Sequence, residues 1–241
     1  YTKIEVEEEM VLEINPKWSN LDDYNSDLRK KYRNKIKKII KLTSDVEIKL
    51  FNSHDVKMYI KEMQELFDQV VESARFNGPN FNVGSFTTFI NEGFMKVYGY
   101  FLHGNLIGFS SEIEKDELLY SYFVGFDKQK NKDLPIYGRI LIENIKHAIQ
   151  LKKKRLILGR TANEYKSNFG AYPVQSFVYL KVRTFLILGQ FEFGANAWCW
   201  NVPSKPKALF GYRTTQSITS PSSSKTVVNP PQEAYHSTDG K

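Results

Sequence analysis

The residues whose types and spacing best suit chemistry lie in one stretch, Leu156–Ala171, which reads LILGRTANEYKSNFGA. This pattern predicts a short buried strand, a sharp exit, a capped helix of one or two turns and a glycine stop. Thr161 and Glu164 have the spacing of a capping box, in which each side chain satisfies a backbone N–H at the helix start. Gly170 is placed for the left-handed residue that ends a helix.

Two cations of this stretch suit an anionic ligand. Lys166 is expected to point off a helix whose N-terminus favours negative charge. Arg160 ends the buried strand beside that N-terminus, where a guanidinium can clamp a carboxylate or phosphate with two hydrogen bonds. A structural interpretation competes with this one. The capping box then accounts for Thr161 and Glu164 without a ligand, Lys166 is solvated, and Arg160 forms an ion pair.

A second group of cations lies in a loop that reads DKQKNKDLPIYGR and runs from Asp127 to Arg139. Its members are Lys128, Lys130, Lys132 and Arg139. Lysine side chains bind phosphate as point charges, so this loop is predicted to hold a phosphorylated ligand. Its single glycine, Gly138, falls inside the helix predicted next in the chain.

A third basic region is an amphipathic helix predicted over residues 19–41, with Ser19 as its cap. No acid occurs between Leu28 and Ser44. The eight cations there are Arg29, Lys30, Lys31, Arg33, Lys35, Lys37, Lys38 and Lys41. Cations in this number on one helix suit contacts with nucleic-acid phosphates and predict a strong salt dependence. A solvated helix face is the more frequent explanation.

The elements that must position these residues follow from hydrophobic periodicity and turn signals. Helices are predicted at residues 54–74, 84–93, 134–152 and 161–169. Strands are predicted at Lys96–His103, Leu106–Glu114, Glu117–Val124, Arg155–Leu158 and Val174–Val182. The order α-α-β-β-β-α-β-α-β indicates a mixed α/β sheet in one domain.

Composition and charge narrow the class of protein. The chain has 241 residues, 41% of them hydrophobic, and a net charge of +7. These values exclude a wholly disordered chain and permit an anionic partner. A single cysteine, Cys199, excludes an intramolecular disulfide and suits a reducing compartment. With no signal peptide and no apolar run that could span a bilayer, a soluble cytoplasmic protein is expected.

The chain is expected to divide into three segments. Residues 1–45 hold an N-terminal segment and the basic amphipathic helix, 46–183 the α/β domain, and 184–241 an irregular, low-complexity tail that is disordered. The start at Tyr1, without a methionine, suggests a fragment or a processed product. Four scattered histidines and one cysteine show no metal-ligand spacing, so no metal is expected.

The element order and three motifs resemble the Gcn5-related N-acetyltransferase (GNAT) superfamily, and within it the Fem-like branch, which includes peptidoglycan aminoacyltransferases. The motifs are LDDY at Leu21–Tyr24 followed by LRKKYR at Leu28–Arg33, VGFD at Val124–Asp127, and GRTAxExKSxxGAxP at Gly159–Pro173. The resemblance covers about residues 17–183. It implies a GNAT-like acyl-CoA N-acyltransferase fold, preceded by the basic helix and followed by the tail.

The resemblance implies transfer of an acyl or aminoacyl group to an amine acceptor. The donor would be acetyl-CoA, another acyl donor or an aminoacyl-tRNA. Its charge would be held by Lys128, Lys130, Lys132, Arg139, Arg160, Thr161 and Lys166. Tyr165 lies where many GNAT enzymes place a tyrosine that protonates the departing thiolate, and core packing is its alternative role. Nothing in the sequence selects a general base among Glu112, Glu114, Tyr120 and Tyr122.

One departure from the family pattern supports a second hypothesis. GNAT domains usually carry Gln/Arg-x-x-Gly-x-Gly/Ala before the helix that follows the fourth strand, where bare N–H groups hold the pyrophosphate of acetyl-CoA. Here Gly138 stands alone. The alternative is therefore a catalytically silent GNAT-fold binding module. It would contact an anionic polymer, tRNA or a cell-wall precursor, through Arg29–Lys41.

Overall fold

Seven strands form one mixed sheet in the computed structural model, which describes residues 1–72 and 81–180. The predicted tail, 184–241, lies outside the described residues, and so does Cys199. The strands are β1 Thr2–Glu13, β2 Glu47–Phe51, β3 Lys96–Leu102, β4 Asn105–Lys115, β5 Leu118–Phe126, β6 Arg155–Ile157 and β7 Tyr172–Leu180. Their order is β2-β3-β4-β5-β6-β1-β7, and β5–β6 is the one parallel pair in it. The predicted mixed α/β class is confirmed.

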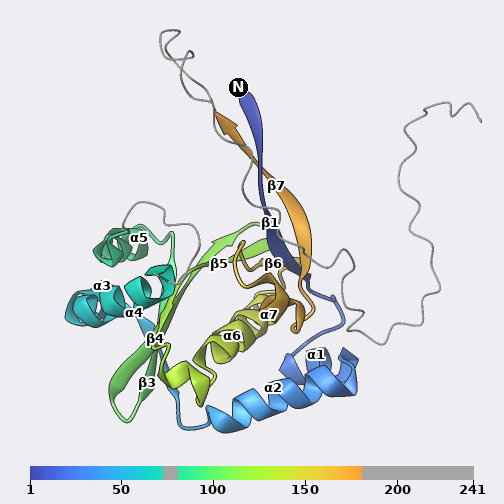
Figure 1. Ribbon diagram of the computed structural model, residues 1–241, viewed down its shortest axis with the longest axis horizontal. Helices are drawn as coiled ribbons and strands as arrows, with labels where there is room; N and C mark the ends of the chain where they lie inside the picture. The colour runs from blue at the N-terminus through green and yellow to red at the C-terminus, as the bar shows by residue number, and fades with distance from the viewer. Residues whose placement is uncertain (73–80, 181–241) are drawn as a thin grey trace, which may run out of the picture. The chain divides into compact units, whose positions relative to one another are not determined.

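Helices cover both faces of the sheet. They are α1 Leu21–Asp27, α2 Lys30–Leu42, α3 Ser53–Met58, α4 Ile60–Glu72, α5 Phe86–Asn91, α6 Ile136–Gln150 and α7 Asn163–Ser167, with 3-10 turns at Val83–Ser85 and Lys130–Lys132. Figure 1 shows α3, α4 and α5 on one side of the sheet and α1, α2, α6 and α7 on the other. The buried apolar side chains divide accordingly, with one cluster under α3–α5 and two others under α6 and its neighbours.

Sequence reasoning found β3–β7, within the described residues, and did not find β1 or β2. In β1, four glutamates within Glu5–Glu9 obscure the pattern, and only Met10–Leu12 is a continuous buried run. In β2, a strand at the edge of the described sheet, Phe51 is the one buried residue. Strands that bury so few side chains have little hydrophobic signal. β1 nevertheless pairs with β6 and β7, and so holds the last described strand on the sheet.

The helix predicted over residues 19–41 is two helices, so that prediction is wrong in its continuity. The backbone of Leu28 and Arg29 is extended, and the Leu28 side chain is buried in the core. The Arg33 guanidinium donates to the carbonyls of Ser26 and Leu28 at 3.3 and 2.9 Å, which satisfies the end of α1. Asn20, and not Ser19, caps α1 by accepting from two backbone N–H groups.

The helix predicted over residues 54–74 is also divided, at Tyr59, whose ring stacks on Phe51. A capping box between Asn52 and Asp55 starts α3 one residue before the predicted start. The helix predicted at 84–93 is a 3-10 turn followed by α5. The helix predicted at 134–152 is confirmed as α6, with Pro135 directly before its first residue.

Candidate functional site

The sheet opens between β5 and β6. These strands pair only where Leu118–Tyr120 lies beside Arg155–Ile157. β6 ends there, while β5 continues to Phe126 with β4 on its other side. The edge of β5 from Ser121 to Phe126 therefore faces no strand among the described residues. Such an edge offers backbone N–H and C=O groups to an extended ligand.

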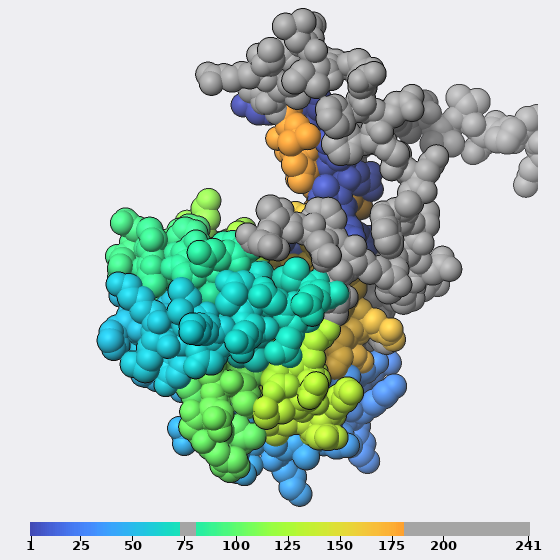
Figure 2. All heavy atoms as spheres, turned by 60° about the vertical axis from the view of Figure 1, so that its left-hand side comes forward, coloured from blue at the N-terminus to red at the C-terminus, as the bar shows by residue number. Residues whose placement is uncertain are grey.

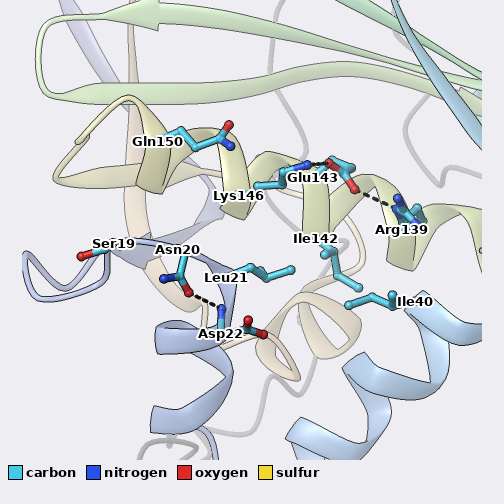
Figure 3. Close-up of a pocket in the computed structure, with 10 residues that line it drawn as sticks. All are labelled: Ser19, Asn20, Leu21, Asp22, Ile40, Arg139, Ile142, Glu143, Lys146 and Gln150. Atoms are coloured by element: carbon cyan, nitrogen blue, oxygen red, sulfur yellow. Dashed lines mark hydrogen bonds and ion pairs between the residues drawn. The ribbon is translucent and has the colours of Figure 1, made fainter.

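Four of the predicted ligand-binding cations lie in the Asp127–Arg139 segment, three in the loop after β5 and Arg139 in the first turn of α6, and two of the four are bound internally. Lys130 forms an ion pair with Asp127. Burial acts to raise the pKa of Asp127, but hydrogen bonds from Lys130 outweigh it and lower the pKa. Arg139 donates from Nε to Glu143 at 2.8 Å, and from Nη1 to the Thr43 carbonyl and hydroxyl at 3.2 Å each. Figure 3 shows the Arg139 side chain directed along α6 toward Glu143.

Backbone groups at the start of α6 are also satisfied by the chain itself. The Tyr137 N–H donates to the Asn131 side chain at 2.9 Å, and the Arg139 N–H donates to the Pro135 carbonyl at 3.0 Å. Lys128 and Lys132 form no ion pair within the described part of the chain. Figure 2 shows this loop in yellow-green at the surface near α4, and the Lys128 N–H donates to Gln69 of α4.

The predicted capping box of the Leu156–Ala171 stretch is wrong. The N-cap of α7 is Ala162, with a left-handed backbone (φ 56°), and no side chain caps the helix. The chain turns first at Gly159 (φ 75°), so Thr161 lies before the cap, and the Thr161 and Arg160 side chains are exposed. Gly170 has the predicted left-handed conformation (φ 92°).

Lys166 is buried, with 3% of its surface exposed, and the prediction that it points into solvent is wrong. α7 lies against β1, whose Met10 N–H donates to the Gly159 carbonyl. Lys166 Nζ donates to the same carbonyl at 3.2 Å. Burial lowers the pKa of Lys166 to about 7, against the opposing effect of Glu9. This lysine therefore holds the strand exit in place and is not a surface anion ligand.

Tyr165 lies in a stack of aromatic rings. Its ring centroid is 5.4 Å from that of Tyr137 and 5.6 Å from that of Phe169, and Lys35 Nζ lies 4.6 Å above the ring. A Cβ atom on Gly138 would lie 2.7 Å from the Tyr165 hydroxyl oxygen. The hydroxyl therefore reaches the first turn of α6, at the end of the basic loop. Burial raises the pKa of Tyr165, which keeps the phenol protonated at neutral pH.

A groove of about 610 Å³ lies between α2 and α7. It is lined by Lys31, Tyr32, Asn34, Lys35, Lys38, Glu164 and Asn168. The groove joins the basic helix to the Gly159–Pro173 motif, two regions that sequence reasoning treated separately. The spacing of Lys31, Lys35 and Lys38 was a usable signal, since residues three and four apart share a helix face. We call this set the groove row.

Among the candidate general bases, Glu112 and Glu114 are both held by other side chains. Glu112 is 1% exposed and its Oε1 lies 2.7 Å from Asn144 Nδ2 and 2.9 Å from His147 Nδ1. Its Oε2 is buried without a hydrogen-bond partner among the described residues. Glu114 pairs with Lys153 and Lys96. Sequence reasoning set His147 aside as a scattered histidine, because its contact with Glu112 spans 35 residues.

Two kinds of feature, a metal-binding cluster and a membrane-spanning helix, are absent from the described residues. No three His, Cys, Asp or Glu side chains gather there as a set that could hold a metal ion. No helix in that part of the chain combines the length and the apolar character needed to cross a membrane.

Comparisons with known proteins bear on the fold. No protein-family model and no curated protein matches the sequence. FemX matches with a TM-score of 0.53 and 11% identity, over 70% of this chain and 60% of its own. A conserved protein of unknown function from Bacteroides thetaiotaomicron matches with a TM-score of 0.55 and 11% identity, over 73% and 60%. L-PGS from Bacillus licheniformis matches with a TM-score of 0.51 and 10% identity, over 72% and 59%.

These likenesses show that the chain shares the fold of FemX and L-PGS, in agreement with the fold that the motifs predicted. The chain spans about 60% of the length of each of these three structures.

Proposed function

We propose that the protein is an N-acyltransferase that moves an acyl or aminoacyl group from a phosphorylated donor to an amine. The proposal rests on two structural features that meet at the first turn of α6. The unpaired edge of β5, from Ser121 to Phe126, leads into the start of α6, and the Tyr165 hydroxyl reaches the same turn at Gly138. The Fem-like fold supports the proposal, because resemblance to Fem-like proteins implies transfer of an acyl or aminoacyl group to an amine.

The reaction follows from these groups. The β5 edge holds the amide groups of a coenzyme donor as an added strand would, with the donor's carbonyl beside it, and an aminoacyl ester would place only its carbonyl there. A neutral amine attacks that carbonyl, forming the C–N bond, and the C–S or C–O bond to the leaving group breaks. Tyr165 donates its proton to the leaving thiolate or alkoxide, the amine releases one proton to solvent, and solvent returns one proton to Tyr165. No covalent enzyme intermediate is needed.

The residues between β5 and α6 do not fit the pyrophosphate of coenzyme A as they stand. Lys130 and Arg139 have acidic partners, and Asn131 occupies the Tyr137 N–H. A helix start binds phosphate through bare N–H groups, and here the N–H groups of Ile136, Tyr137 and Arg139 have acceptors within the chain. We therefore define the donor by its chemistry, as an activated acyl group on a phosphate-bearing carrier. Acetyl-CoA and aminoacyl-tRNA are the two donors of this kind that we consider.

Acyl transfer to a panel of primary amines, measured with acetyl-CoA and with aminoacyl-tRNA, tests the proposal. Tyr165→Phe should lower kcat by about 10²–10⁴-fold, with little change in KM, because it removes a proton donor and keeps the ring stack. An unchanged kcat would show that Tyr165 only packs. Calorimetric titration with acetyl-CoA separates the donors, since no binding at high micromolar concentration excludes coenzyme A and leaves aminoacyl-tRNA.

A second candidate is a catalytically silent module that contacts an anionic polymer through Arg29–Lys41. The internal pairing of the loop cations favours it, because a silent module needs no donor site. It predicts no transfer with either donor but salt-dependent binding of tRNA. Fluorescence anisotropy with tRNA and an unrelated RNA across a salt series measures this. Binding that is indifferent to salt would contradict it.

A further inference from the structure

α2 carries its lysines in two rows. The groove row, Lys31, Lys35 and Lys38, lines the groove against α7. Lys30, Lys37 and Lys41 form an outer row that does not line it. At 100° per residue, the centres of the two rows lie about 100° apart around the helix axis. The buried face, with Ile36 and Ile39, takes up a third side. The two rows therefore present equal charge to different surroundings.

The residues that line the groove include more lysines than acids. Within the described residues, neither Lys31 nor Lys38 forms an ion pair. Glu164 on α7 is the one acid among the residues that line the groove, against the three lysines. The Asn168 amide on the same wall donates to the carbonyls of Glu164 and Tyr165. A concave surface with an excess of one charge concentrates counter-ions of the other sign.

The groove also borders the group proposed to act as an acid. Lys35 lies 4.6 Å above the Tyr165 ring, whose hydroxyl reaches Gly138 at the start of α6. A phosphate bound by Lys31 and Lys38 thus lies on the α2 side of Tyr165. For its acyl group to lie at the β5 edge, the same donor must run from the groove past Tyr165. In the loop region, Lys130 and Arg139 are already paired, which leaves Lys128 and Lys132 as the competing cations.

We propose that the α2–α7 groove is the binding site for the donor's phosphate groups, in place of the loop between β5 and α6. The ligand class is a phosphate ester or diphosphate, carried by either a nucleotide coenzyme or the end of a tRNA. The identity of the donor rests on the proposed acyl transfer. Binding of phosphate in the groove does not depend on acyl transfer, and it can be measured without an acyl-transfer assay.

The test compares two double variants of the full chain. Lys31→Gln with Lys38→Gln removes two charges from the groove row, and Lys30→Gln with Lys37→Gln removes two from the outer row at the same seven-residue spacing. Glutamine keeps a helix propensity close to that of lysine. Calorimetry with pyrophosphate and coenzyme A, and anisotropy with tRNA, are run at about 0.15 M salt, where unpaired exposed charges are screened beyond about 8 Å.

The groove-row variant should lose about tenfold or more in affinity for pyrophosphate, equivalent to about 1.4 kcal/mol. The outer-row variant should lose less than about threefold, because its charges act only over a screened distance. Glu164→Gln should strengthen binding by removing the acid from the groove. A coenzyme donor predicts the same ratio of losses with coenzyme A. A tRNA donor predicts it with tRNA only.

Equal losses in the two variants would overturn the proposal, since binding would then follow net charge. A larger loss in a Lys128→Gln, Lys132→Gln variant would return the site to the loop. Acyl-transfer assays of the unmodified chain are scored separately. Transfer without groove dependence refutes this inference and leaves the function standing. Groove-dependent phosphate binding without transfer supports the inference and refutes the function.

Discussion

The Asp127–Arg139 segment and the α2–α7 groove are both basic, but they differ in how many of their cations pair with an acid nearby in the chain. In the loop, Lys130 is three residues after Asp127 and Arg139 is four residues before Glu143, and both pairs form. In α2, no acid occurs from Leu28 to Ser44, so local pairing of this kind is unavailable. The comparison teaches that an acid three or four residues away can take up a cation that the sequence offers to a ligand, as Asp127 does with Lys130 and Glu143 with Arg139.

The largest effect on stability that would test this comparison is expected at Arg139. If Arg139 is structural, Arg139→Gln should lower the free energy of unfolding by about 3 kcal/mol, because Glu143 is left buried without its main partner. The value lies at the low end for a buried pair, since Lys146 remains 3.3 Å from Glu143. Urea unfolding measures it. Lys132→Gln, in the same loop and unpaired, is the control and should change stability by less than about 0.5 kcal/mol.

A stable Arg139→Gln variant with weakened donor binding would reverse the assignment. Arg139 would then be a ligand for the donor, as its sequence position suggested, and the loop and the groove would no longer differ.

A smaller effect is expected at Gly138, where the helix that follows the loop meets the wall of the groove. Alanine in a helix interior normally stabilises it by about 1 kcal/mol relative to glycine. Here the added Cβ would lie 2.7 Å from the Tyr165 hydroxyl and 2.9 Å from Ile39 Cδ1. Gly138→Ala should therefore destabilise the protein, by about 1–2 kcal/mol.

A thermodynamic cycle with Tyr165→Phe checks the cause of that loss. Phenylalanine removes the hydroxyl oxygen, so the cost of Gly138→Ala should shrink by about 1 kcal/mol in that background. Thermal or urea unfolding of the four proteins gives the coupling. A stabilising Gly138→Ala would mean that the Tyr165 hydroxyl does not reach the start of α6.

Lys166 gives a third, pH-dependent contrast with Lys31 and Lys38, the exposed lysines of the groove row. Burial lowers its pKa to about 7, while an unfolded chain keeps the lysine protonated to about pH 10. Between these values the unfolded state binds up to one more proton, so stability should rise with pH by up to about 1.4 kcal/mol per unit. Below pH 7 both states are protonated and the contribution is constant. Lys166→Met should abolish this rise in urea unfolding at pH 7 and pH 9, and equal slopes in both proteins would refute it.

Much of the fold was predictable because its central strands alternate clearly and its turns are marked. The strands from Lys96 onward and α6 were found in this way. The breaks at Leu28 and Tyr59 were not found, because the apolar repeat continues through both. At Leu28 the chain turns to place a buried side chain, and Arg33 satisfies the freed carbonyls. Such tertiary contacts do not appear in local periodicity.

The candidate site was predictable only in its ingredients. The Gly159–Pro173 motif and the basic helix were both identified, but the groove that joins them depends on packing between α2 and α7. The burial of Lys166 depends on β1, more than 140 residues earlier in the chain, and β1 was not predicted. Residues that are brought together by distant elements carry no shared sequence signal.

The most direct test of the central claim is a map of backbone amide shifts in ¹⁵N-labelled protein titrated with pyrophosphate. If the groove holds the donor's phosphates, the largest shifts will fall on Lys31–Lys38 of α2, on Glu164 in α7 and on Asn168 directly after α7. Amides from Asp127 to Arg139 will change little. The largest shifts within Asp127–Arg139, with α2 unchanged, would contradict the account and place the phosphate site in the loop.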